Sequence, residues 1–234
     1  MRCNVCDSVL EKVLYDSQST KSLTSLCTLY EGVVLVYFCT QCAHIQSEEI
    51  ENIDGYYDKD YDILINSEDE DQVYEVVNNY TIYRTSHQVK TLVSKVPVHQ
   101  GTKILDYGCA KSSTMRELLN AYKDVSPYLF DVSERYVPFW SKFLSRDNWA
   151  TYEIPISWDN QFDVMTSFFS LEHMAKPQEA LHNASRVLKV GGYLYGVVPN
   201  VFTNPADLIV VDHINHFTPI SLRFLLQNSG FDVI

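Results

Sequence analysis

The chain has 234 residues, of which 46% are hydrophobic and 21% are charged, as in a soluble globular protein rather than a disordered or fibrous one. It carries 18 Lys and Arg against 30 Asp and Glu, and the net charge of −12 opposes the counterion release that drives nucleic-acid binding. We therefore expect no nucleic-acid partner. The acids are concentrated in residues 48–71, which predicts a solvated acidic surface or linker.

The N-terminal region has no membrane-targeting pattern. The first residues, MRCNVCDS, lack the apolar stretch of a signal peptide, and the longest apolar run, residues 32–39, is far shorter than the ~20 residues that span a bilayer. We therefore expect a cytoplasmic protein without a membrane span. In such a reducing compartment, cysteines are metal ligands or buried thiols more often than disulfides.

Four of the six cysteines form two CxxC pairs, Cys3 with Cys6 and Cys39 with Cys42. Each pair can turn two thiolates toward one ion, and two pairs supply the four sulfur ligands of a structural Zn²⁺ site. We predict a zinc ribbon over residues 1–50, with unligated thiols as the alternative. The remaining cysteines, Cys27 and Cys109, are interpreted as buried side chains.

Residues 51–100 are polar and tyrosine-rich at first and then helical in rhythm. The apolar positions Val73, Val76, Val77 and Tyr80 have the i, i+3, i+4, i+7 spacing of an amphipathic helix, so we predict a helical connecting segment. The tyrosines at 56, 57 and 61 either line an acceptor pocket or lie at the surface or an interface.

From Gly101 onward, short apolar runs alternate with helical stretches. We predict strands near residues 103–107, 128–130, 151–156, 162–168 and 192–198, with helices between them. A final helix is expected to begin at a Thr218 cap and to stop at Gly230. This alternation predicts an α/β, Rossmann-like doubly wound sheet whose ligand binds at the carboxyl ends of the strands.

The turn after the first of these strands, Asp106–Ser113, lies where such a fold receives a nucleotide-like ligand. Gly108 permits close approach of the backbone, and Asp131 ends the next strand, where a carboxylate can accept hydrogen bonds from ribose hydroxyls. Taken alone this pattern is weak, because Ala110 and Ser112 stand where a glycine-rich loop has glycines.

Longer stretches strengthen the interpretation. ILDYGC, then FDVS, then FDVMTSFFSLEHM through RVLKVGGYLYGVVPN resemble the class I S-adenosylmethionine-dependent methyltransferases over about residues 101–234. VYFCTQCAHIQ at the second cysteine pair and DHINHFTPISLRFLLQNSGF near the end resemble the sugar C-methyltransferases. The resemblance implies a methyltransferase with S-adenosylmethionine (SAM) as cofactor.

The resemblance also implies a set of cofactor-binding residues. Asp106 and Gly108 would form the floor of the methionine pocket, with Ala110 at the position of closest approach. Asp131 would hold the ribose and Val132 would flank the adenine, while Ser167 and Phe168 would contact the methionine moiety. Tyr152 either stacks on the adenine or is an ordinary core or surface tyrosine.

A methyltransferase needs a base that removes the acceptor's proton, and histidine has a suitable pKa. The segment DHINH resembles the part of the sugar C-methyltransferases in which a histidine is the base and an acid orients it, which would be His213 and Asp212 here. The alternative is that this segment caps and packs a loop. His173 in LEHM either faces the acceptor or belongs to a packing motif.

The expected function is methylation, at carbon or oxygen, of a small-molecule acceptor such as a sugar or nucleotide-linked sugar. The alternatives are a catalytically silent binding module, in which the zinc ribbon mediates assembly, and a protein methyltransferase. A homo-oligomer is left open. The chain stops at residues 231–234 within the expected sixth strand, so we expect that it is truncated or that a partner completes the sheet.

Overall fold

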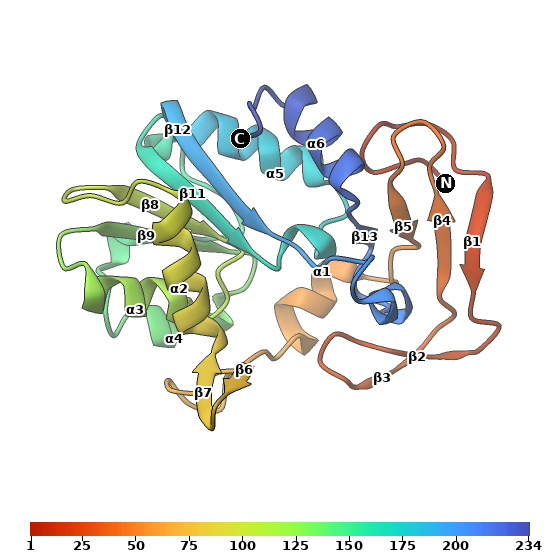
Figure 1. Cartoon of the computed structure of the whole chain (residues 1–234), viewed down its shortest axis with the longest axis horizontal. Coiled ribbons are helices and arrows are strands. Elements are labelled where there is room, and N and C mark those ends of the chain that lie inside the picture. The colour runs from red at the N-terminus through yellow and green to blue at the C-terminus, as the bar shows by residue number, and fades with distance from the viewer. The chain divides into compact units, whose positions relative to one another are not determined.

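The computed structural model describes residues 1–53, 55–58 and 61–234, which form two compact units (Figure 1). The first unit comprises Met1–Gly55, Phe169–Ser185 and Val197–Ile234, and the second comprises Tyr56–Phe168 and Arg186–Gly196. Within the part of the chain that is described, no helix has the length and apolarity needed to cross a bilayer.

The second unit is built on a five-stranded sheet. Its strand order is β10 (Trp149–Thr151), β9 (Ser126–Asp131), β8 (Lys103–Tyr107), β11 (Phe162–Phe168) and β12 (Leu188–Val197). The first four strands in this order pair in parallel. The expected Rossmann-like fold is therefore confirmed. Strand β10 is shorter than the predicted strand and lies earlier in the chain, ending at Thr151.

Three helices cover one face of this sheet: α2 (Arg84–Lys95), α3 (Ser113–Ala121) and α4 (Val137–Trp140) (Figure 1). Each contributes a fully buried apolar side chain, Leu92, Leu118 and Trp140 respectively, to one cluster with strand residues Ile104 and Leu129. Burial of such side chains contributes roughly 1.5–3 kcal/mol each, so this cluster holds the helices on the strands.

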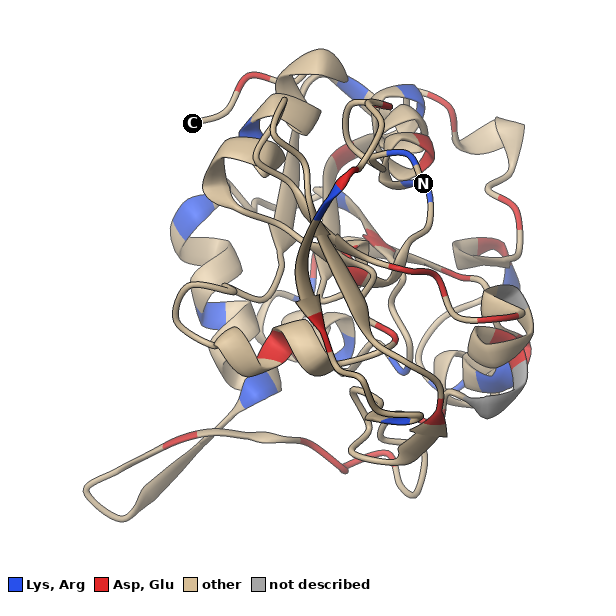
Figure 2. Ribbon diagram, turned by 90° about the vertical axis from the view of Figure 1, so that its right-hand side faces the viewer, with Lys and Arg blue, Asp and Glu red and all other residues tan. Residues whose placement is uncertain are grey.

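The helix predicted over residues 73–80 is wrong, because this segment is a β-hairpin. Strand β6 (Val73–Val77) pairs antiparallel with β7 (Tyr80–Tyr83), and the hairpin extends away from the rest of its unit (Figures 1 and 2). Asn78 and Asn79 connect the strands with φ of 50° and 65°, the left-handed pair that a type I′ turn requires. Val and Tyr also favour strands.

The acidic segment before the hairpin is anchored at several points. Ile63 and Ile65 pack against the apolar cluster between the sheet and helices α2, α3 and α4. Lys111 Nζ donates hydrogen bonds to the carbonyl oxygens of Ser67 and Glu70, at 2.8 and 2.7 Å. Of the two alternatives predicted from its charge, a solvated acidic surface or a linker, these contacts disfavour a loose linker. Its backbone is tied to the start of α3.

The first unit contains an antiparallel four-stranded sheet in the order β1 (Lys12–Asp16), β4 (Leu35–Phe38), β5 (Ile45–Ser47) and β13 (Asn215–His216). A second antiparallel pair joins β2 (Lys21–Leu23) and β3 (Leu29–Glu31). Cys27 lies between these two strands at the surface, with φ of 59°, so its predicted burial is wrong. Cys109, in the other unit, is buried as predicted.

The last long helix of the first unit, α6 (Pro219–Asn228), begins as predicted. Thr218 and Ser221 form a reciprocal capping box, which satisfies backbone donors at the helix start. The other helical elements are α5 (Pro177–Val187), α1 (Ile53–Gly55), a π-helical turn (Tyr56–Asp60) and the 3₁₀ turns Glu134–Tyr136, Arg146–Asn148, Ile156–Trp158, Leu171–His173 and Pro205–Ile209.

Candidate functional site

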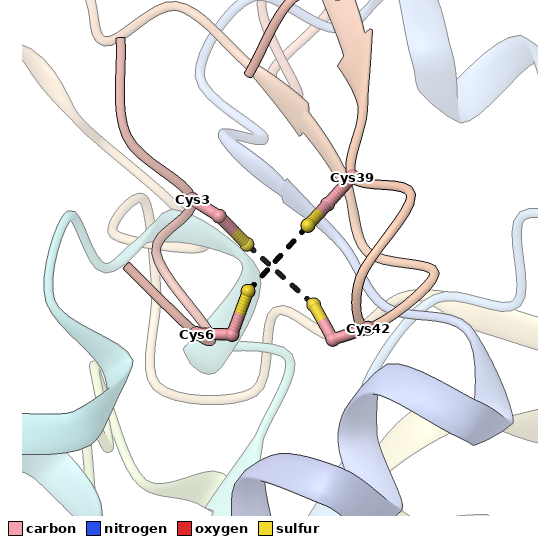
Figure 3. Close-up of side chains that lie close together, drawn as sticks. All are labelled: Cys3, Cys6, Cys39 and Cys42. Atoms are coloured by element: carbon pink, nitrogen blue, oxygen red, sulfur yellow. Dashed lines mark hydrogen bonds between the residues drawn. The ribbon is translucent and has the colours of Figure 1, made fainter. Parts of the chain in front are cut away.

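The four paired cysteines lie together in the first unit (Figure 3). The Sγ atoms of Cys3 and Cys42 are 3.6 Å apart, those of Cys6 and Cys39 are 3.5 Å apart, and all four lie within 4.8 Å of one another. A tetrahedral Zn²⁺ with sulfur ligands at ~2.3 Å places the sulfurs about 3.8 Å apart. The cluster therefore fits a structural zinc ion.

Both CxxC turns have the same backbone geometry. Asp7 N donates to Cys3 O and Ala43 N donates to Cys39 O, each at 2.9 Å. Asp7 and Ala43, which directly follow the second cysteine of each pair, both have a left-handed φ, 60° and 58°. The repeated turn explains why two separate segments present their thiols in the same way.

In the second unit, Asp106 lies near the carboxyl end of β8. Its carboxylate is buried and accepts hydrogen bonds from Ser112 Oγ and Thr166 Oγ1, both at 2.8 Å. Burial raises the pKa of Asp106 to about 6, and the two hydroxyl donors limit that rise. Asp106 therefore joins the turn after β8 to the neighbouring strand β11.

The turn after β8 has the left-handed backbone conformation that favours glycine, although two of the three residues concerned are not glycine. Gly108, Ala110 and Ser112 have φ of 66°, 45° and 55°, all in the left-handed region. Trp140 Nε1 donates to Ala110 O at 2.7 Å, and Ala110 N donates to Asp131 Oδ2 at 2.8 Å. Contacts from α4 and β9 thus hold both backbone groups of Ala110.

Asp131 ends β9 at the same edge of the sheet as Asp106. Its other oxygen accepts a hydrogen bond from Ser133 N at 3.2 Å, and burial raises the pKa of Asp131 to about 6. The next residue, Val132, is 49% exposed. The structure therefore places the predicted ribose-binding carboxylate beside the predicted loop, with an exposed apolar side chain next to it.

The end of β11 completes this edge. The Ser167 hydroxyl is buried and has no hydrogen-bond partner in the part of the chain that is described, and Phe168 packs edge-on against Tyr195 with ring centroids 5.8 Å apart. A buried hydroxyl of this kind is suited to a polar ligand. The seven predicted cofactor residues thus lie at the carboxyl ends of β8, β9 and β11 or in the turns that directly follow them.

The predicted catalytic residues lie in the first unit. His213 Nδ1 and Asp207 Oδ1 are 2.7 Å apart, and His216 Nδ1 is 3.0 Å from Asp207 Oδ2. Asp207, in the 3₁₀ turn Pro205–Ile209, is buried and had not been predicted. Its position six residues before His213 is the only sequence signal that could have indicated it.

Asp212, the acid predicted to orient His213, has other partners. Its carboxylate accepts hydrogen bonds from Ser25 N and Ser25 Oγ at 2.7 and 2.6 Å. Its backbone oxygen lies 2.9 Å from His173 Nδ1. The carboxylate that pairs with the ring of His213 is therefore that of Asp207, while Asp212 anchors the β2–β3 connection and orients His173.

His173 and His213 meet edge to face, with ring centroids 4.6 Å apart. Burial, together with a positive charge on His213, lowers the pKa of His173 to about 4. Burial also lowers the pKa of His213, but the hydrogen bond to Asp207 and the charge of Glu172 outweigh it, so the pKa lies above its ordinary value. The pair therefore holds one neutral ring and one that protonates more readily.

The tyrosines at 56, 57 and 61 form an aromatic cluster with centroids 5.1–5.9 Å apart. Tyr152 is 52% exposed and its hydroxyl donates to Asp58 Oδ1 at 3.2 Å. Ser133 Oγ donates to the backbone oxygen of Asp58 at 3.3 Å. Through Asp58, the segment that carries these tyrosines is hydrogen-bonded to residues that follow β9 and β10.

Comparison with known proteins gives one short match to a curated relative. A stretch of 48 residues, 20% of this chain, is 46% identical to the ubiquinone/menaquinone biosynthesis C-methyltransferase UbiE of Roseobacter denitrificans. The match spans 19% of the length of that enzyme.

Solved structures agree over a larger part of the chain. A chain in the complex between the Trm112 methyltransferase activator and a methyltransferase of Haloferax volcanii superimposes with a TM-score of 0.53 at 20% identity, covering 63% of this chain and 69% of that one. A SAM-dependent methyltransferase from Archaeoglobus fulgidus gives a TM-score of 0.51 at 20% identity with the same coverage. A family model described as a methyltransferase domain matches residues 78–234. With the parallel sheet and the acidic strand ends described above, this match shows that the chain belongs to the methyltransferase-domain family.

Proposed function

We propose that this protein transfers the methyl group of SAM to a small-molecule acceptor. The observation that carries the proposal is the arrangement at the carboxyl ends of β8 and β9, where Asp131 and the backbone of Ala110 lie in direct contact. In the proposed complex, Asp131 accepts the ribose hydroxyls and Val132 flanks the adenine. Gly108 and Ala110 allow the methionine moiety to approach the backbone, and the Ser167 hydroxyl, with Phe168 beside it, meets its polar end.

SAM supplies an activated methyl group, so the protein's task is to align the acceptor and remove its proton. We assign His213 as the base, with Nε2 as the atom that takes the proton. The Nδ1 contact to Asp207 fixes the ring and stabilises the positive charge that forms on it. His173, held by the backbone of Asp212, lies beside His213 and is proposed to contact the acceptor.

The proposed acceptor is a sugar or nucleotide-linked sugar. Tyrosines, such as those at 56, 57 and 61, offer an aromatic face and a hydroxyl, and the histidines at 173 and 213 offer hydrogen-bonding groups, all of kinds that bind sugars. The short likeness to a C-methyltransferase supports carbon as the methylated atom. Zinc in the four-cysteine site is proposed to be structural, because four sulfurs leave no open coordination position.

The cofactor assignment is tested by calorimetric titration with SAM and with S-adenosylhomocysteine. We expect micromolar binding by the wild type and loss of binding in Asp131→Ala, while Asp124→Ala, a change at an exposed acid of the same unit, keeps wild-type affinity. Because the pKa of Asp131 is about 6, binding should tighten as the pH rises from 5 to 7 and the carboxylate ionises. No binding by a folded wild type would favour the silent module.

The base assignment is tested separately, with methyl transfer to a panel of nucleotide sugars measured as S-adenosylhomocysteine release. The substitution His213→Gln should lower turnover by at least ~100-fold, in the range expected for loss of a general base. Its affinity for SAM should not change, since His213 is not among the residues proposed to bind SAM. Full activity in His213→Gln would refute the assignment.

A further inference from the structure

A second cluster of metal-binding side chains lies in the first unit, apart in sequence from the four cysteines. Glu172, His173 and His213 each offer one ligand atom, and these three atoms lie within 4.8 Å of one another. Glu172 is fully buried, and the side chains of His173 and His213 are 10% and 11% exposed. Two imidazoles and one carboxylate therefore converge in a nearly dry site.

The hydrogen bonds of the two rings determine which nitrogen faces the cluster. His173 Nδ1 lies 2.9 Å from the backbone oxygen of Asp212, which can only accept, so this nitrogen carries the proton. His213 Nδ1 is likewise fixed by the carboxylate of Asp207 at 2.7 Å. In the neutral rings, Nε2 is then the nitrogen that carries no proton. Histidines that bind metals are oriented in this way, with the other ring nitrogen donating to a carboxylate or a backbone carbonyl.

We propose that Glu172, His173 and His213 form a binding site for a divalent transition-metal ion, with Nε2 of each histidine and the Glu172 carboxylate as ligands. Imidazole and carboxylate ligands bind zinc, cobalt, nickel or iron(II) ions. Softer ions such as copper(I) bind preferentially to sulfur ligands. Three protein ligands leave coordination positions open for water or another small ligand, in contrast to the four-sulfur site.

The site has a consequence for catalysis, which rests on the function proposed above. The metal would bind Nε2 of His213, the atom assigned as the base, so this nitrogen cannot hold an ion and accept a proton at the same time. A bound divalent ion is therefore an inhibitor of methyl transfer. The ion and the acceptor's proton compete for one lone pair.

The binding test is a Co²⁺ titration of the full chain whose cysteine site is already filled with zinc. We expect one Co²⁺ per chain, with the visible bands of nitrogen and oxygen ligation and without the near-ultraviolet charge transfer of a Co²⁺–thiolate bond. The substitutions His173→Ala and Glu172→Gln should each weaken Co²⁺ binding by at least ~10-fold, as for loss of one ligand, whereas His182→Ala, at an exposed histidine on α5, should not. Absence of Co²⁺ binding at millimolar concentration, or equal binding by His173→Ala, would overturn the proposal.

Two further measurements use the wild type, so that they do not depend on whether a variant folds. In nuclear magnetic resonance spectra, Co²⁺ should broaden or shift the imidazole signals of His173 and His213 before those of His182; an effect on His182 first would contradict the site. In the turnover assay, the same Co²⁺ concentrations should inhibit S-adenosylhomocysteine release. Binding without inhibition would leave the metal site standing and refute His213 as the base.

Discussion

Ala110 has a backbone conformation that glycine adopts at lower cost. Its φ of 45° brings Cβ close to the following carbonyl, and both of its backbone groups are fixed, by Asp131 and by Trp140. The surrounding contacts therefore impose a conformation that the side chain opposes. Strain of this kind is concentrated at binding sites, where the turn must follow one path to accept a ligand.

Replacing Ala110 with glycine should relieve this strain. We expect Ala110→Gly to raise the free energy of unfolding by about 0.5–1 kcal/mol, the left-handed penalty less the added entropy of an unfolded glycine. The matched change Ala121→Gly, in helix α3, should lower it by up to about 1 kcal/mol. Urea unfolding measures both. A destabilised Ala110→Gly protein would show that the turn is not strained.

Asp207 is the second residue whose role can be tested. Its hydrogen bond raises the pKa of His213, and a base acts only when it is deprotonated, so the acidic limb of the pH–rate profile should lie above the ordinary histidine value of about 6.5. In Asp207→Asn this limb should move to lower pH, and turnover at neutral pH should fall by roughly 100-fold or more because the ring loses its orientation.

The pH dependence separates positioning from folding. A purely structural role for Asp207 would lower the yield of folded protein and leave the acidic limb in place. Rescue of the wild-type profile by Asp207→Glu would support the carboxylate contact. An unshifted limb in folded Asp207→Asn would contradict the assignment.

At the scale of elements, the hairpin β6–β7 shows why periodicity alone misled the prediction. The apolar residues have helical spacing, but consecutive positions of β6 are all exposed, so no apolar face is buried as the helix would require. The paired asparagines favour a tight turn, and the valines favour strands. Turn chemistry was the stronger signal, and the sequence contained it.

Helix α6 is an element whose start was predictable and can be tested. Thr218 Oγ1 accepts a hydrogen bond from Ser221 N at 3.1 Å and donates one to Ala43 O at 3.0 Å, next to the second cysteine pair. We expect Thr218→Ala to lower the free energy of unfolding by about 1–2 kcal/mol. Thr20→Ala, at an exposed threonine of the same unit, should change it by less than about 0.5 kcal/mol. Equal effects would show that the cap is not stabilising.

At the scale of the molecule, the first unit is assembled from three separate stretches of the chain, and long-range contacts hold them. Asp212 reaches Ser25 across 187 residues, and β13 adds to the sheet formed by β1, β4 and β5. The stability of such a unit depends on contacts that hold its N-terminal stretch in place. We expect a zinc ion in the four-cysteine site to provide such contacts.

The zinc prediction follows from this dependence. Cys39→Ser should carry about one zinc equivalent less than the wild type and should unfold at a lower denaturant concentration, because metal binding contributes to folding free energy. Cys27→Ser, at an exposed cysteine outside the cluster, should retain both the zinc and the stability. Metal analysis of protein purified without chelators measures this. Equal zinc content in the two variants would rule out the site.

The sequence by itself determined the alternating strands and helices, the acidic strand ends at Asp106 and Asp131, and the spacing of the cysteine pairs, because these features depend on local periodicity and short-range motifs. Tertiary structure alone decided that Asp207 rather than Asp212 pairs with His213. It also brought Glu172, His173 and His213 together and imposed left-handed backbone on Ala110 and Ser112. These features depend on side-chain direction and on contacts between distant segments, which neighbouring residues in a chain do not encode.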